Sequence, residues 1–110
     1  MDLIGKWMIK KALYPTEEEM CFLTREEMVA NGVEDPDELE IFYTAIEIKE
    51  DGTLNTYMQL PKRRVKVDST TWFERDGVYF YLLDGEEDQL ALTEDGLLRF
   101  SMGMMLMERQ

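Results

Sequence analysis

Alternation of apolar and polar residues is the dominant pattern along this chain, and it predicts β-strands for most of its length. In residues 3–14, Trp7 and Ile9 alternate with Lys6 and Lys10, which is typical of a half-buried strand. After residue 40, four Asp-Gly pairs separate runs of high strand propensity, and Asp-Gly supplies the positive φ that tight hairpin turns require. The expected strands are 41–49, 53–60, 64–68, 70–75, 78–83, 89–93 and 97–108.

The last of these runs allows two interpretations. Every second residue from Leu98 to Leu106 is apolar, which predicts a single apolar face. Gly103 interrupts the opposite face, and a glycine inside a strand often marks a bend. Residues 97–108 therefore form either one bent strand or two strands joined by a tight corner.

Residues 17–40 follow a different pattern and predict a short helical insertion. This segment contains ten acidic residues and one basic residue, so it carries −9 of the net charge of −12. Thr24 can cap a helix, Glu27 completes a capping box three residues later, and Gly32 can end the helix. We expect a helix near residues 24–31 on the surface of a β-domain.

These elements together predict a mainly β fold in a single domain, residues 1–110. Seven to nine consecutive strands with short turns form an antiparallel meander, which either closes into a barrel or packs as a sandwich. Closure removes unpaired sheet edges, so we expect a barrel with the helical insertion outside it.

One family has this arrangement together with a recognisable tryptophan. Gly5-Lys6-Trp7 opens the first strand, a helical insertion and a run of hairpins follow, and Arg109 ends the last strand. The chain resembles the lipocalin-like (calycin) barrels, and among them small bacterial domains. The resemblance implies that Gly5, Trp7 and Arg109 close one end of the barrel as structural residues, with Arg99 as the fallback arginine. It also implies a helical lid at the other end and a small hydrophobic ligand in the interior.

The interior of such a barrel can be a ligand pocket or a filled core. Nine methionines is a high count for this length, and methionine adapts to varied apolar ligands. An eight-stranded barrel is, however, only just wide enough for its own side chains, and the short chain favours a filled core. The first function hypothesis is therefore binding of a small hydrophobic molecule, and the alternative is a structural or protein-interaction module. The candidate ligand-binding residues are Phe42, Ile46, Met58, Trp72, Phe80, Phe100, Met102 and Met104.

Composition narrows the chemistry further. The net charge of −12 disfavours nucleic acid and anionic lipid as partners, because both are polyanions. The chain has no histidine and only one cysteine, Cys21, so it lacks the usual general base, an internal disulfide and a four-thiolate zinc site. We predict no enzyme activity, no metal and no cofactor. No signal peptide and no apolar run of membrane-spanning length are recognised, which predicts a cytoplasmic location without membrane insertion; a secreted or processed form stays open.

The basic run from Lys62 to Lys66 admits three interpretations. Four positive charges in five residues could bind a phosphate or carboxylate, could keep an edge strand solvated, or could face the acidic segment 17–40 of the same or another chain. As an interaction module, the protein would use its acidic face or an apolar patch left exposed by Met105 and Met107. We expect a monomer or a weak homodimer.

Overall fold

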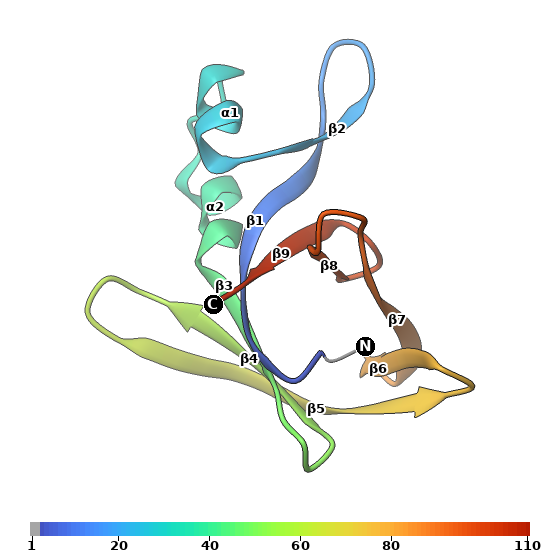
Figure 1. The fold of residues 1–110 in the computed structure, drawn as a ribbon. Coiled ribbons are helices and arrows are strands. Elements are labelled where there is room, and N and C mark those ends of the chain that lie inside the picture. Colours follow the sequence, from blue (N-terminus) through green and yellow to red (C-terminus); the bar gives the residue numbers. More distant parts are fainter. Residues whose placement is uncertain (1–2) are drawn as a thin grey trace.

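Eight antiparallel strands close into a barrel, with a ninth strand and three short helices outside it (Figure 1). The computed structural model describes residues 3–110, and the numbers of strands and helices refer to that part of the chain. The elements are β1 (Gly5–Pro15), β2 (Met20–Leu23), α1 (Arg25–Ala30), α2 (Pro36–Leu39), the 3₁₀ helix η1 (Glu40–Tyr43), β3 (Thr44–Ile48), β4 (Thr53–Gln59), β5 (Arg64–Arg75), β6 (Val78–Leu83), β7 (Glu86–Leu92), β8 (Leu98–Phe100) and β9 (Met105–Arg109).

Strand β1 closes the barrel because it pairs on both sides. Trp7 lies opposite Ile46 of β3 on one side and opposite Arg109 of β9 on the other. From β3 to β9, each strand pairs with the next along the chain, as expected for a meander. The predicted fold class, a mainly β antiparallel barrel with a short helical insertion, is confirmed.

All four Asp-Gly pairs lie in turns between strands, as predicted. At Asp76-Gly77 and Asp84-Gly85, both residues have positive φ, with values of 54° and 80° in the first turn and 52° and 83° in the second. This is the pattern of the two-residue type I′ turn, which matches the right-handed twist of the flanking strands.

Residues 97–108 form two strands joined by a tight turn, so the predicted corner is correct and the continuous apolar face is not. Ser101 and Met102 both have positive φ, and Met104 N donates to Ser101 O at 3.0 Å, which reverses the chain between β8 and β9. Met102 and Met104 consequently lie in the turn with 71% and 49% of their surface exposed. The prediction that these two methionines line the interior is wrong, because alternation cannot continue through a reversal.

The same turn also changes where Met105 and Met107 lie, which were expected to form an exposed apolar patch. Met107 is fully buried, and Met105 is partly buried against the core. Met107 lies opposite Leu98 across the β8–β9 ladder, so both side chains point inward. The exposed patch expected from Met105 and Met107 therefore does not exist.

Segment 17–40 contains the predicted helix and one strand that the sequence did not indicate. Glu27 N donates to the Thr24 hydroxyl at 3.2 Å, and Thr24 N donates to the Glu27 carboxylate at 3.0 Å, so the capping box is complete. Val33 N donates to Met28 O at 3.1 Å beyond Gly32, an arrangement that ends a helix as a Schellman motif. The strand before it, β2, pairs with the end of β1 and forms a hairpin that projects from the barrel (Figure 1).

The core is one contiguous cluster of buried apolar side chains. Met28 and Val33 from the helical segment belong to the same cluster as the barrel residues, so this segment covers the core near Ala12 and Leu23. The side chains that are less than 2% exposed are Trp7, Tyr81, Leu3, Ile46, Ile48, Leu54, Leu90, Leu98 and Met107.

Candidate functional site

The three residues that the resemblance identified, Gly5, Trp7 and Arg109, lie together in the structure. The Trp7 indole is 1% exposed, and its Nε1 donates to Leu3 O at 3.0 Å. The Arg109 guanidinium lies over the ring, with Cζ 4.3 Å from the centroid, and its Nη1 donates to Ile4 O at 2.8 Å. A Cβ at position 5 would come within 2.9 Å of that Nη1, so Gly5 leaves room for the arginine. The expected contacts among these residues are present, and they are structural.

The side chains at the centre of the barrel are deeply buried and form one cluster. A void wide enough for a ligand would leave accessible surface on the side chains around it. The nine largest buried side chains each expose less than 2% of their surface, which is the packing expected of a filled core. Of the predicted ligand-binding residues, Phe42, Ile46 and Phe100 are buried in this same cluster, where they serve as core.

Phe80 lies on the outer surface of the barrel, which corrects its predicted interior position. It stacks on Phe73 of the neighbouring strand, with ring centroids 5.6 Å apart. Arg75 covers both rings at 5.3 and 5.4 Å and makes a two-point ion pair with Glu87, at 3.0 and 2.8 Å. That hydrogen bond lowers the pKa of Glu87 and raises the pKa of Arg75. Tyr81, the residue after Phe80 in β6, is 1% exposed and points into the barrel instead.

Trp72 and Met58 are partly buried near the margins of the barrel. The Trp72 indole Nε1 donates to Lys49 O at 2.7 Å, and its ring lies 6.0 Å from that of Tyr79. Met58 lies opposite Thr44 on β3 and is half-buried. The indole N–H of Trp72 already has a backbone acceptor, so Trp72 does not need a ligand to satisfy its hydrogen bond.

Tyr81 is the one strongly perturbed acid–base group among the described residues, and its role is structural. Burial is the main cause that raises the pKa of Tyr81, and the neighbouring Asp88 carboxylate raises it further. The Tyr81 hydroxyl accepts from Ser101 N at 3.0 Å, and Asp88 accepts from Met102 N at 2.9 Å. The pair therefore holds the backbone of the β8–β9 turn.

Four surface pockets of about 180 to about 430 Å³ lie outside the barrel centre. Two flank the helices and the β1–β2 hairpin, and one is lined by acidic residues of the β6–β7 turn. The smallest, of about 180 Å³, lies on the outer face beside β1 and is bordered by Lys6, Gln59, Arg64 and Gln110. This pocket adjoins the most basic part of the molecule.

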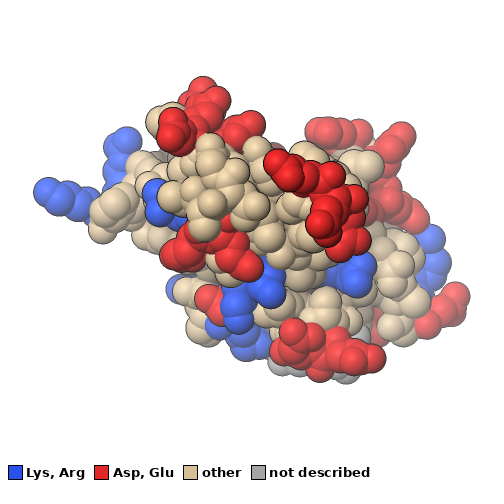
Figure 2. All heavy atoms as spheres, turned by 90° about the horizontal axis from the view of Figure 1, so that it is seen from above, with Lys and Arg blue, Asp and Glu red and all other residues tan. Residues whose placement is uncertain are grey.

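The basic run lies at the tip of the β4–β5 hairpin, which extends away from the barrel (Figure 1). We call Lys62, Arg63, Arg64 and Lys66 the basic tip. Figure 2 shows Lys and Arg side chains on this protruding arm, whereas over the rest of the face Lys and Arg side chains lie among many acidic ones. Within residues 3–110, none of the four cations makes an ion pair. The interpretation in which the basic tip faces the acidic segment of its own chain is therefore wrong.

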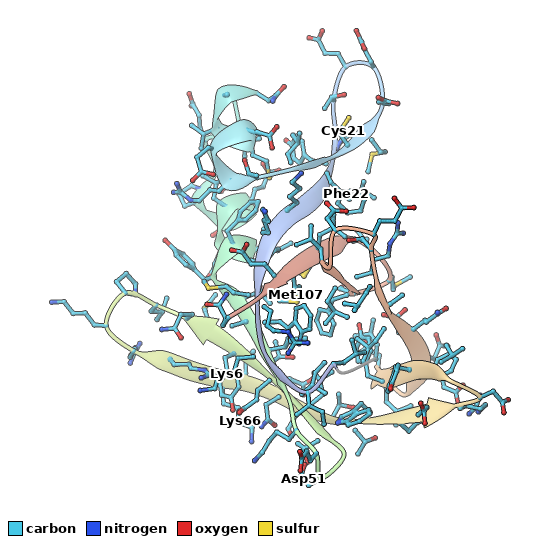
Figure 3. The ribbon with its side chains drawn as sticks, viewed as in Figure 1. Lys6, Cys21, Phe22, Asp51, Lys66 and Met107 are labelled. Atoms are coloured by element: carbon cyan, nitrogen blue, oxygen red, sulfur yellow. The ribbon has the colours of Figure 1, made fainter. Side chains whose placement is uncertain are left out.

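One cation of the basic tip packs on an aromatic ring, and a lysine of β1 lies on the same side of the sheet. The Arg64 guanidinium stacks on the Tyr57 ring, with Cζ 3.7 Å from the centroid, and the Tyr57 hydroxyl donates to Glu47 at 3.4 Å. Strand register places Lys6 and Lys66 on the same outer side of the sheet, as Figure 3 shows. Sequence reasoning identified this run but could not show that its cations make no ion pair with the rest of residues 3–110.

Comparison with known proteins gives no information about the function of this chain. No protein-family model, curated protein or solved structure matches the chain. Across residues 3–110, no three Cys, Asp or Glu side chains are grouped so as to hold a metal ion. No helix in this part of the chain has the length and apolar character needed to cross a membrane.

Proposed function

We propose that this chain is a lipocalin-like barrel with a filled core, and that it acts as a non-catalytic protein-interaction module through the outer face of its β4–β5 hairpin. The observation that carries the proposal is the contrast between interior and surface. Buried apolar side chains form one cluster inside the barrel, whereas the four charges of the basic tip have no ion-pair partner within residues 3–110.

The lipocalin-like assignment rests on the closed end of the barrel. Gly5, Trp7 and Arg109 are far apart in the sequence, and the close approach of the guanidinium to the indole requires a glycine beside it. A cytoplasmic location, in which Cys21 stays reduced, remains part of the proposal, as does the absence of enzyme activity.

The competing function is binding of a small hydrophobic molecule inside the barrel, and one experiment separates the two. Native mass spectrometry of protein purified from its host should show the mass of the chain without an added small molecule. Thermal unfolding with fatty acids, sterols and haem-like compounds should show no shift, because a ligand that binds only the folded state raises its stability. A copurified apolar molecule, or a shift that grows with ligand concentration, would contradict the filled-core proposal.

A further inference from the structure

The first half of β5 has a free edge, and this edge is the most accessible hydrogen-bonding surface of the basic tip. Strand β5 pairs with β6 only through Trp72–Arg75, whereas residues 64–69 pair only with β4. Every residue from Arg64 to Ser69 is exposed, and Val67 exposes 58% of its surface. The strand therefore runs past the end of β6, and no other strand of residues 3–110 pairs with its free side (Figure 1).

The ladder between β4 and β5 shows which backbone groups point toward this free edge. Leu60 N donates to Arg63 O at 2.8 Å, and hydrogen-bonded and non-bonded pairs alternate in an antiparallel ladder. Tyr57 and Lys66 are thus a non-bonded pair, and the N–H and C=O of Lys66 point away from β4. The same reasoning applies to Arg64, which lies opposite Gln59 two pairs closer to the turn.

The positive charge of the basic tip determines which kind of strand would pair best with this edge. Residues 62–67 contain four cations and no acid, so a basic or neutral strand gains less here than an acidic one. Exposed Val65 and Val67 offer apolar contacts between the charges. A second copy of this chain paired through the same edge would bring its own basic tip close to this one, which the repulsion between like charges opposes.

We infer that an extended acidic segment of a partner protein adds to the free edge of β5 as an extra strand. The backbone groups of Arg64 and Lys66 hydrogen-bond its main chain, and the basic tip pairs with its carboxylates. This inference rests on the proposed function and names the partner chemistry for the same surface. The β-bulge beside Val67, where the β4–β5 register shifts, twists the edge and limits how far the added strand can extend.

The test uses a fluorescent seven-residue peptide of alternating Glu and Val, and binding is measured by fluorescence anisotropy at low ionic strength. Two matched variants separate charge from backbone pairing. Lys66→Gln removes the charge, and Lys66→Pro removes the charge and the edge N–H; proline is tolerated where that N–H faces solvent. We expect Lys66→Pro to bind roughly threefold to tenfold more weakly than Lys66→Gln, since one hydrogen bond is lost. Near-UV circular dichroism should show that both variants keep the wild-type fold.

Three further measurements can overturn the inference. Methylation of alternate backbone nitrogens removes N–H groups of the peptide that strand pairing needs. If the methylated peptide binds as well as the parent, binding depends on charge alone and not on an added strand. Tighter binding of a single-stranded oligonucleotide than of the peptide would assign the basic tip to nucleic acid. Self-association that Lys66→Pro abolishes would assign the edge to a second copy. None of these results bears on the filled core, which fails separately if an apolar molecule occupies the barrel.

Discussion

Replacing Trp7 tests the packing on which the whole barrel depends. Its indole is 1% exposed, donates to Leu3 O and lies under Arg109, so Trp7→Ala removes buried area, a hydrogen bond and a cation–π contact together. Replacing a buried aromatic side chain by alanine typically costs about 3–5 kcal/mol. A domain of this size has a total stability of about 5–15 kcal/mol, so the variant should lose a large fraction of it.

The free energy of unfolding is measured by urea denaturation followed by far-UV circular dichroism. Trp72→Phe is the control, because Trp72 is only partly buried and one hydrogen bond to Lys49 O is at stake. This control should lose about 1 kcal/mol. The contact with the arginine is isolated by a double-mutant cycle of Trp7→Leu and Arg109→Met, with an expected coupling of about 0.5–2 kcal/mol. A loss below about 1 kcal/mol for Trp7→Ala would refute the assignment of Trp7 as the closing residue.

Three further predictions concern single groups. The raised pKa of Tyr81 means that the unfolded chain loses this proton first, so stability should fall as pH rises above 10.0, the ordinary tyrosine value, and Tyr81→Phe should flatten that decline in alkaline urea titrations. Hydrogen bonds from Thr24 lower the pKa of Glu27, so the stability they add is present above pH 4.5 and is lost on acidification; Glu27→Gln should reduce this acid dependence, and equal acid slopes would contradict the capping role. Gly5→Ala places a methyl group 2.9 Å from the Arg109 guanidinium at a φ of +136°, and should lower stability by about 1–3 kcal/mol; an unchanged melting temperature would show that this contact has no importance.

Local signals in the sequence predicted individual elements well. The Thr24–Glu27 capping box and the Asp76-Gly77 turn depend on residues a few positions apart, and both formed as expected. The reversal at Ser101 and Met102 was harder, because both have positive φ without being glycine and carry no turn signature. Strand β2 was missed because its four residues lie between acidic runs that favour exposure.

Alternation showed which residues share a face but not which face points inward. Val78, Phe80 and Leu82 alternate along β6 and share one face, which is the outer face and not the interior predicted for Phe80. A strand with apolar residues on both faces, such as β6, gives no local indication of direction. Tyr81 faces inward because its position opposite Trp72 in the closed barrel places it there.

The Asp-Gly turns and the cap of α1 could be predicted from the sequence, because they arise from neighbouring residues. Closure arose from residues at opposite ends of the chain: Trp7 met Arg109 only when β1 paired with β9. The same closure selected the inward faces of the strands, whereas the local turn between β8 and β9 left Met102 and Met104 exposed. Within residues 3–110, the closure also left the first half of β5 paired on one side only, because the length of one strand relative to the next is a property of the assembled sheet.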